Sequence, residues 1–334
     1  MGPAPAKFES PCRPPAWVRG GHAQTILAHF LPIEEPALTE DARDIELPDG
    51  DRLRAFYREG GTGVLVTIFH GLSGDSGADY VRLTQAVARR LGHSVLAVNH
   101  RGCGPGRGLA RGLYHSGRAD DVGAVLSWAR ETLPERRQLA VGFSLSGNAL
   151  LLLLSGGAGD ARPDGAIAIN PPIDLRACSV RISKGLNRIY DLRFVRRCMG
   201  TVRERVADGL LAPEFARLQP RSLWDFDELV TAPLGGFADA EDYYRRCSTR
   251  ERLGTIEVPT VLLTAADDPF VPVEAYRAAR TSPSTCLHVE AHGGHVGYLS
   301  GGPLGLAPRR WLGPALEHYL RALGGGAASP TRGS

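Results

Sequence analysis

Short apolar runs and longer segments with helical spacing alternate along most of this chain. Runs of this length, with apolar residues on both faces, fit strands that are buried on both faces. They occupy residues 64–69, 94–98, 138–141, 166–169, 260–264 and 285–290. Apolar residues that recur every three or four positions predict amphipathic helices over residues 80–91, 121–132, 273–280 and 309–323. The alternation predicts an α/β protein with a mostly parallel central sheet and helices on both faces.

One long stretch interrupts this alternation. Residues from about 174 to 255 are arginine-rich and helical in character, with no clear strand. A helical block inserted between strands of such a sheet is expected to form a cap over its functional edge. We therefore expect an N-terminal arm over residues 1–40 that packs on the core, and one domain over residues 41–323 that contains the cap. The domain would open with a hairpin over residues 45–57, and the glycine- and serine-rich residues 324–334 would form a disordered tail.

The turn after the apolar run at residues 138–141 holds the most specific motif of the chain. It reads Gly142-Phe143-Ser144-Leu145-Ser146, close to the Gly-x-Ser-x-Gly pattern of a nucleophile elbow. A tight strand–turn–helix connection lifts the Ser144 hydroxyl above the sheet edge, where a base can reach it. Ser146 stands where the pattern has glycine, and we expect tolerable crowding there because Gly147 follows. Ser146 is not the expected nucleophile, since Ser144 and Asn148 would then occupy both glycine positions.

Two adjacent aspartates follow the strand predicted over residues 260–264. A serine nucleophile needs a nearby base, and the base needs an orienting acid. On a nucleophile-elbow fold these groups follow along the chain in the order Ser, Asp or Glu, His. Asp268 is the expected acid because it stands four residues before Pro272, and Asp267 is the alternative.

Two histidines follow the last predicted strand, in the order that this fold requires for the base. His295 lies among glycines that allow the loop to fold back toward the serine, with Gly293 and Gly294 before it and Gly297 after it. We therefore expect His295 to be the base that takes the proton of the Ser144 hydroxyl. His292 is expected to be exposed.

Acyl transfer also needs N–H donors for the oxyanion that develops on the substrate. The backbone N–H of Leu145, directly after the candidate nucleophile, is one expected donor. The other is the N–H of Leu72, in the loop after the strand at residues 64–69, where His70-Gly71 lets the backbone turn sharply. His70 is interpreted as a support for this loop and not as a base.

Composition limits the partners and the compartment. The chain has 334 residues, 43% hydrophobic and 22% charged, with a net charge of +3, which is typical of a soluble globular protein with one large core. Its basic residues are almost all arginine and form no run interleaved with aromatics, so no nucleic-acid partner is expected. Six cysteines lack paired spacing, so neither disulfides nor a zinc knuckle are expected. No signal peptide or transmembrane segment is recognisable, which predicts a cytoplasmic protein and leaves room for weak peripheral membrane contact through a lid.

Two further clusters lack the spacing of a ligand site. Residues 101–106 follow a strand and are rich in glycine, but Pro105 and the absence of Gly-x-Gly-x-x-Gly indicate a plain loop. The spacing of a second group fits no metal site, so its side chains are expected to hydrogen-bond the loops beneath the substrate pocket: Asn99, His100, His115 and Asp120. No metal or organic cofactor is expected. Four aromatic residues either line an acyl site or simply pack in the core: Trp224, Phe226, Tyr243 and Tyr244.

Nine segments spread over most of the chain carry a family resemblance. They are residues 20–26, 70–72, 99–102, 113–117, 142–145, 170–172, 226–227, 266–269 and 293–295. Together they resemble the YheT-like branch of the α/β-hydrolase superfamily, a branch related to the eukaryotic ABHD lipases. The resemblance implies the α/β-hydrolase fold and hydrolysis of esters, often with short-chain or lipid-like acyl groups. Ser146 departs from the elbow of that family.

The interpretation as a whole is a lipase-like serine esterase, that is, a carboxylesterase with a catalytic triad. Ser144 would be the nucleophile, His295 the base and Asp268 the acid, with the N–H groups of Leu72 and Leu145 as the oxyanion hole. An acyltransferase on the same triad is the first alternative. A non-catalytic ligand-binding homologue of hydrolases is the second.

Overall fold

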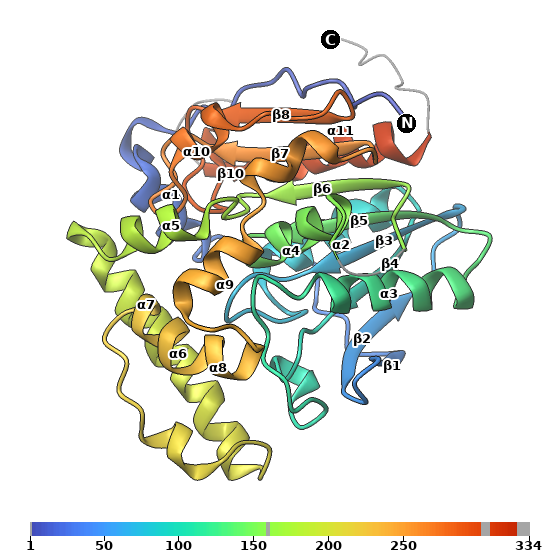
Figure 1. Ribbon diagram of the computed structural model, residues 1–334. Coiled ribbons are helices and arrows are strands. Elements are labelled where there is room, and N and C mark those ends of the chain that lie inside the picture. Colours follow the sequence, from blue (N-terminus) through green and yellow to red (C-terminus); the bar gives the residue numbers. More distant parts are fainter. Residues whose placement is uncertain (1, 158–160, 302–307, 326–334) are drawn as a thin grey trace, which may run out of the picture.

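The computed structural model describes residues 2–157, 161–301 and 308–325, and its centre is an eight-stranded sheet (Figure 1). The strands are β1 (Ala42–Glu46), β2 (Arg52–Arg58), β3 (Val64–Phe69), β4 (Ser94–Val98), β5 (Arg137–Phe143), β6 (Gly165–Ile169), β7 (Thr260–Ala265) and β8 (Thr285–Glu290). Their order in the sheet is β1-β2-β4-β3-β5-β6-β7-β8. All neighbours from β4 to β8 pair in parallel, whereas β1, β2 and β4 pair antiparallel. The predicted mostly parallel sheet is confirmed.

Helices cover both faces of this sheet, as predicted. On one face, α2 (Asp79–Arg90) and α11 (Leu312–Gly324) share a core with Val66 and Ile68 of β3. On the other face, α3 (Ala119–Thr132), α4 (Leu145–Leu154) and α10 (Val273–Ala278) pack with Leu65 and Phe69 of the same strand. Because alternate residues of β3 point to opposite faces and each face is covered, both sets must be apolar. This explains the continuous apolar runs of the sequence.

The residues between β6 and β7 fold into helices and short turns, and we call residues 174–255 the helical insertion. Its helices are α5 (Leu175–Ile182), α6 (Arg188–Ala207), α7 (Leu223–Phe226), α8 (Ala232–Gly235) and α9 (Ala240–Cys247). Figure 1 shows them together to one side of the sheet. Asp174 caps the first of them, since its side chain accepts a hydrogen bond from the Ala177 N–H at 2.9 Å. These helices have small apolar cores of their own.

Two local predictions were incomplete at the ends of the chain. The N-terminal arm contains a helix that the apolar pattern did not predict, α1 (Gly21–Ala28). The helix predicted to begin at residue 309 begins at Leu312, because Pro308–Arg310 pairs as strand β10 with β9 (Leu299–Gly301). The helix extends through Gly324, where the tail was expected to begin. The rest of the predicted disordered tail, residues 326–334, lies outside the described residues.

Candidate active site

Ser144 lies on the turn between β5 and α4. Its backbone has φ 50° and ψ −119°, a conformation that non-glycine residues rarely adopt and that is typical of a nucleophile elbow. The turn packs closely at two glycines: a Cβ on Gly142 would lie 2.9 Å from the Ser146 carbonyl oxygen, and one on Gly147 would lie 3.0 Å from the Gly142 carbonyl oxygen. Glycine therefore occupies both of these closely packed places.

The structure brings the three side chains of the predicted triad together. The Nε2 atom of His295 lies 2.8 Å from the Oγ of Ser144, and its Nδ1 lies 2.8 Å from the Oδ2 of Asp268. Asp268 is fully buried, and the His295 side chain is 12% exposed. A carboxylate that accepts from the Nδ1–H leaves the Nε2 lone pair facing the serine hydroxyl. This is the arrangement in which an imidazole can remove a hydroxyl proton.

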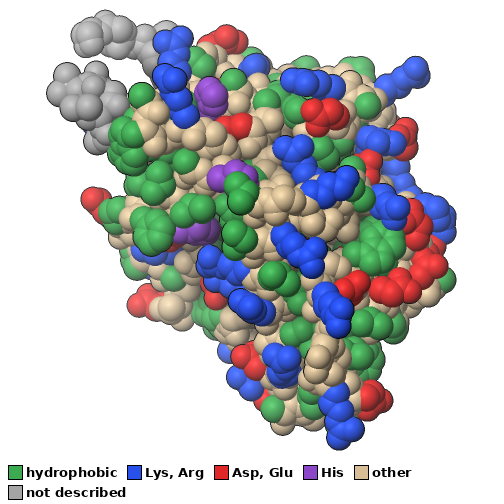
Figure 2. All heavy atoms as spheres, turned by 90° about the vertical axis from the view of Figure 1, so that its left-hand side faces the viewer, with side chains coloured by type: hydrophobic (Ala, Val, Ile, Leu, Met, Phe, Trp, Pro, Cys, Tyr) green, Lys and Arg blue, Asp and Glu red, His purple; other side chains and the backbone are tan. Residues whose placement is uncertain are grey.

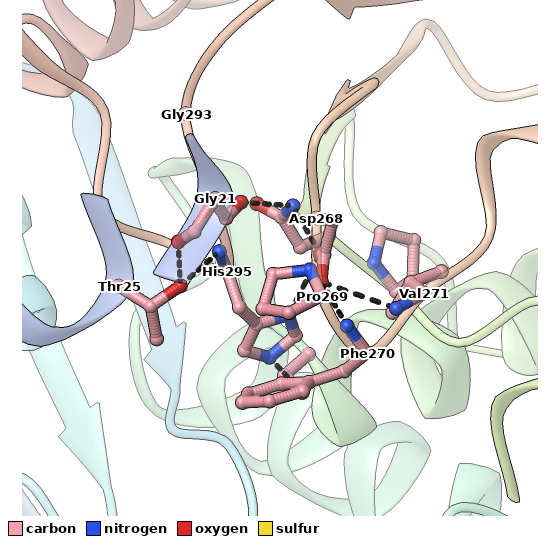
Figure 3. A network of polar contacts seen from close by, with 12 residues as sticks. Gly21, Thr25, Asp268, Pro269, Phe270, Val271, Gly293 and His295 are labelled. Carbon is pink, nitrogen blue, oxygen red and sulfur yellow. Dashed lines mark hydrogen bonds and ion pairs between the residues drawn. The ribbon is translucent and has the colours of Figure 1, made fainter. Parts of the chain in front are cut away.

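The carboxylate of Asp268 is held from several directions. Its Oδ1 accepts hydrogen bonds from the N–H groups of Phe270 and Val271, at 2.7 and 3.1 Å (Figure 3). Its Oδ2 accepts a further bond of 2.7 Å from the Nδ2 of Asn170, at the carboxyl end of β6. Four donors in all, counting His295, thus compensate the burial of this negative charge.

The neighbouring aspartate makes different contacts. The Oδ1 of Asp267 accepts from the N–H groups of Gly293 and Gly294, at 2.9 and 2.8 Å. Its Oδ2 lies 3.5 Å from the Nδ1 of His292, whose side chain is 45% exposed. Asp267 thus contacts the backbone of the histidine loop, whereas Asp268 contacts the ring of His295.

The helix α1 of the N-terminal arm packs against the loop that carries His295 (Figure 3). The Oγ1 of Thr25 accepts the His295 N–H at 2.9 Å and donates to the Gly21 carbonyl at 2.7 Å. The helix lies so close that a Cβ on Gly21 would fall 1.6 Å from the Asp267 carbonyl oxygen. Gly294 meets the same helix, since a Cβ there would lie 2.4 Å from the Gly21 oxygen. The glycine next to His295 therefore makes room for α1, a role that the sequence interpretation missed.

The second side of Ser144 is formed by the loop after β3. Leu72 and Leu145 line the same cavity as Ser144, and a Cβ on Gly71 would lie 3.1 Å from the Cβ of Ser144. Within the described residues, neither the Leu72 nor the Leu145 N–H donates a hydrogen bond. Both of the predicted oxyanion donors are thus available to a ligand.

The hydroxyl of Ser146 is the centre of a buried network beneath this loop. It donates to the carbonyl oxygen of His70, and it lies 2.7 Å from both the Tyr114 hydroxyl and the Nε2 of His100. The rings of His100 and Tyr114 stack with their centroids 3.9 Å apart. The Ser146 hydroxyl therefore links the nucleophile elbow to the carbonyl of His70, directly before Gly71. The sequence interpretation treated Ser146 only as a steric departure and missed this role.

His70 has contacts that fit a support for the loop. Its Nδ1 lies 2.8 Å from the Gly71 carbonyl, and its Nε2 accepts the His100 N–H at 3.1 Å. Burial lowers the pKa of His70 to about 4 and lowers that of His100 well below its usual value, so both rings are neutral near pH 7. The Gly71 N–H donates to the Tyr80 hydroxyl at 3.0 Å, which fixes the same loop from α2.

Ser144 and His295 open into a cavity of about 170 Å³ between the sheet and the helical insertion. Most of the side chains that line it are apolar, among them Ile182, Phe194 and Val202. Of the four aromatic residues that the sequence singled out, three line this cavity: Phe226, Tyr243 and Tyr244. The fourth, Trp224, is not among the lining residues and packs its ring against that of Tyr244, with centroids 5.3 Å apart.

One carboxyl group also lines the cavity. Burial raises the pKa of Asp227 to about 6, against the opposing effect of hydrogen bonds from the hydroxyls of Thr231 and Tyr244, each at 2.7 Å.

In the described ranges, no group of three or more His, Cys, Asp or Glu side chains could hold a metal ion. No helix of the described part of the chain is both long and apolar enough to cross a bilayer.

Comparison with known proteins places this site in a family. Residues 64–302 match the family model described as the alpha/beta hydrolase fold, which is well over half of the chain. This chain belongs to the alpha/beta hydrolase fold family. It is 32% identical over 307 residues to YheT of Escherichia coli (strain K12), a candidate esterase, and the match covers 90% of this chain and 89% of that protein. The resemblance to the YheT-like branch is thereby confirmed.

Two yeast relatives carry more specific names. The monoacylglycerol lipase of Saccharomyces cerevisiae (strain ATCC 204508 / S288c) is 27% identical over 77% of this chain and 59% of that protein. The medium-chain fatty acid ethyl ester synthase/esterase 2 of the same strain is 29% identical over 78% of this chain. Because the match covers only 60% of the latter and 59% of the lipase, this chain spans less than two thirds of either protein.

A solved structure supports the fold. The esterase Pf2001 of Pyrococcus furiosus superposes with a TM-score of 0.54, over 85% of this chain and 92% of that chain. The two sequences are 19% identical, so the comparison supports the predicted α/β-hydrolase fold and nothing finer.

Proposed function

We propose that this carboxylic ester hydrolase works through an acyl-enzyme formed on Ser144. The observation that carries the proposal is the pair of 2.8 Å contacts that the His295 ring makes, one to the Ser144 Oγ and one to the Asp268 Oδ2. The unused N–H groups of Leu72 and Leu145 in the same cavity support it.

In the first half of the proposed cycle, His295 Nε2 takes the hydroxyl proton while the Ser144 Oγ bonds to the ester carbonyl carbon. The carbonyl oxygen becomes an oxyanion, which accepts hydrogen bonds from the two leucine N–H groups. When this intermediate collapses, the bond to the alkoxy oxygen breaks and the leaving alcohol takes the proton from His295. The products are a free alcohol and an acyl ester of Ser144.

In the second half, a water molecule attacks the acyl carbon while His295 Nε2 takes its proton. The same two N–H groups hold the second oxyanion, and its collapse releases a carboxylic acid as the Ser144 Oγ regains the proton. Asp268 accepts the Nδ1–H of His295 throughout and stabilises the imidazolium that forms in each half. The side chains and N–H groups of five residues thus supply every proton transfer and hydrogen bond of the cycle.

The apolar lining of the cavity supports an ester with a hydrocarbon acyl group, short-chain or lipid-like. A yeast relative named as a monoacylglycerol lipase is consistent with that class. We further propose that the helical insertion is the cap of the domain over residues 41–323, because its helices supply much of the cavity wall. The cytoplasmic location and the absence of a nucleic-acid partner stay predictions from the sequence.

The decisive experiment replaces the proposed nucleophile. Ser144→Ala should lower hydrolysis of p-nitrophenyl butyrate by about 10⁴-fold or more, because the remaining groups cannot form the acyl-enzyme. A fluorophosphonate probe should label wild type at Ser144, located by mass spectrometry of the peptide, and should not label the variant. Full activity of Ser144→Ala would end the proposal.

Acyl transfer to an alcohol is the second candidate, favoured by one observation. A relative named as an ethyl ester synthase as well as an esterase is 29% identical to this chain. Transfer would use the same acyl-enzyme, with an alcohol in place of water in the second half. Adding ethanol to the assay and measuring the ratio of ethyl ester to free acid separates the two reactions.

A further inference from the structure

Four large apolar side chains near the active site are exposed on the surface formed by α1 and the start of α6. Ile26 is 46% exposed, Phe30 76%, Leu186 72% and Ile189 69%. Leu186 lies in the short turn Gly185–Asn187 just before α6. Large apolar side chains that remain in water over adjoining elements mark a surface that binds something. We call these four residues and the basic residues around them the α1/α6 surface.

The two elements of this surface are in direct contact. The rings of His22 on α1 and Tyr190 on α6 stack with centroids 5.6 Å apart, and the His22 Nδ1 lies 3.2 Å from the Tyr190 hydroxyl. His29, at the end of α1, is close enough to Arg193 and Arg197 that their charges lower its pKa, although burial lowers it most. The exposed apolar groups of the two helices therefore belong to one continuous face.

This face is strongly basic. Residues 175–203 contain eight Arg or Lys and a single acidic residue, Asp191, against a net charge of +3 for the whole chain. Asp191 is 1% exposed and accepts the Leu223 N–H at 2.7 Å, so it does not face solvent. In the part of the chain that the structure describes, six exposed basic side chains of this segment make no ion pair: Lys184, Arg188, Arg193, Arg196, Arg197 and Arg203. Figure 2 views the side on which α1 and α6 lie and shows hydrophobic and basic side chains next to one another.

The α1/α6 surface adjoins the candidate active site. The ring of Tyr190 packs on that of Phe270 with centroids 4.8 Å apart, and Phe270 packs on His295 at the same distance. Asn187 donates to the carbonyl of Pro269 at 2.7 Å, next to the buried Asp268. Ligands bound at this surface would lie beside the loop that holds the histidine.

We propose that the α1/α6 surface binds the anionic surface of a lipid bilayer. Exposed aliphatic and aromatic side chains gain free energy when they enter the boundary between headgroups and acyl chains. Unpaired arginines around them are attracted to anionic headgroups at that depth. A nucleic acid would satisfy the arginines but would leave Leu186 and Ile189 in water. The combination of both groups on one face therefore favours a bilayer, and this inference does not depend on the proposed catalytic cycle.

Vesicle co-sedimentation tests the proposal with the full chain. Wild type should bind vesicles of phosphatidylcholine with about 30% phosphatidylglycerol at about 0.1 M NaCl, and much more weakly at about 1 M NaCl, where charges are screened. It should bind pure phosphatidylcholine weakly as well. Arg193→Glu/Arg196→Glu should reduce binding to the anionic vesicles by more than about tenfold. Leu186→Ser/Ile189→Ser should also reduce it severalfold, because the apolar contribution is lost.

Matched variants make the result decisive. Arg252→Glu/Arg280→Glu changes the net charge by the same amount and should bind like wild type. These two exposed arginines precede β7 and β8, at the edge of the sheet opposite to the one where Asp268 and His295 follow the same strands. Leu229→Ser removes an apolar side chain that is 42% exposed outside the surface, and should also bind like wild type. Each variant should keep the wild-type circular dichroism and hydrolysis of a soluble ester. The proposal would be overturned if wild type failed to bind, or if Arg252→Glu/Arg280→Glu lost as much binding as Arg193→Glu/Arg196→Glu. Ser144→Ala should bind the vesicles like wild type, whether or not it keeps its esterase activity.

Discussion

The two sides of Ser144 are held by different means. On the histidine side, the His295 N–H donates to Thr25, and Asp268 accepts separate hydrogen bonds from Asn170 and the backbone of residues 270–271. On the oxyanion side, the carbonyl before Gly71 depends on a small cluster whose centre is the hydroxyl of Ser146. Support that is spread over several segments should tolerate the loss of one contact, whereas a cluster that shares one central hydroxyl should tolerate the loss of that hydroxyl less well. The expected effects of substitution separate the two cases.

The largest expected effect distinguishes the neighbouring aspartates. Asp268→Asn should lower kcat by about 10³–10⁴-fold, because an amide cannot stabilise the imidazolium or fix its tautomer. Asp267→Asn should cost less than about tenfold, since its amide oxygen can still accept from Gly293 and Gly294. Steady-state kinetics on p-nitrophenyl butyrate measure both. Equal losses would mean that the two carboxylates share the work of orienting His295.

The next effect tests the oxyanion side. Ser146→Ala should lower kcat by about 10–100-fold with little change in KM, because the loop that presents Leu72 would lose the hydroxyl at the centre of its buried cluster and the transition state gains most from that donor. Ser116→Ala is the matched control, since this buried hydroxyl accepts from the Asn148 side chain at 2.8 Å, away from the loop. It should cost thermal stability without lowering kcat. A purely structural role for Ser146 would make the two variants behave alike.

A smaller effect is expected from one contact on the histidine side. Thr25→Val removes the acceptor of the His295 N–H, and the remaining contacts should limit the loss in kcat to less than about tenfold. Thr84→Val is the control, because the Thr84 hydroxyl donates to the Tyr80 carbonyl within α2 in the same way that Thr25 donates within α1. If the Thr25→Val loss exceeded that of Ser146→Ala, the contrast between the two sides would be wrong.

The smallest effect is the pH dependence of stability caused by Asp227, a carboxyl group that belongs to neither the histidine side nor the oxyanion side of Ser144. Because the folded pKa of Asp227 is raised to about 6, the folded state holds this proton more tightly than the unfolded state does. The stability that this provides is present at low pH and is lost as pH rises through the folded pKa. Relative to wild type, the free energy of unfolding of Asp227→Asn should therefore be about 1–2 kcal/mol higher at about pH 7 than it is at about pH 4. Unfolding by urea at the two pH values measures the difference, and a pH-independent difference would contradict the assigned direction.

Local patterns account for what the sequence predicted. Ser144 could be proposed as the nucleophile because strand, turn and helix follow within a few residues, and Asp268 and His295 as its partners because each comes just after an apolar strand. Parallel strands end at one edge of the sheet, so these three side chains were expected to meet there. Thr25 and Ser146 were not identifiable as supports, because their bonds join residues 270 and 76 positions apart in the chain. Neither hydroxyl differs, in the sequence alone, from one that faces water.

Because α1 packs against the loop that carries His295, the candidate active site is linked to the order in which the chain is synthesised. Thr25 leaves the ribosome 270 residues before His295, the residue whose N–H its side chain accepts. The carbonyl of Asp267 and the glycine at position 21, which approach closely, are likewise made at well-separated times. A nascent chain that has already completed β3 to β6 would therefore still lack the contact between α1 and the loop of His295, and would acquire it only after residue 295 has been made.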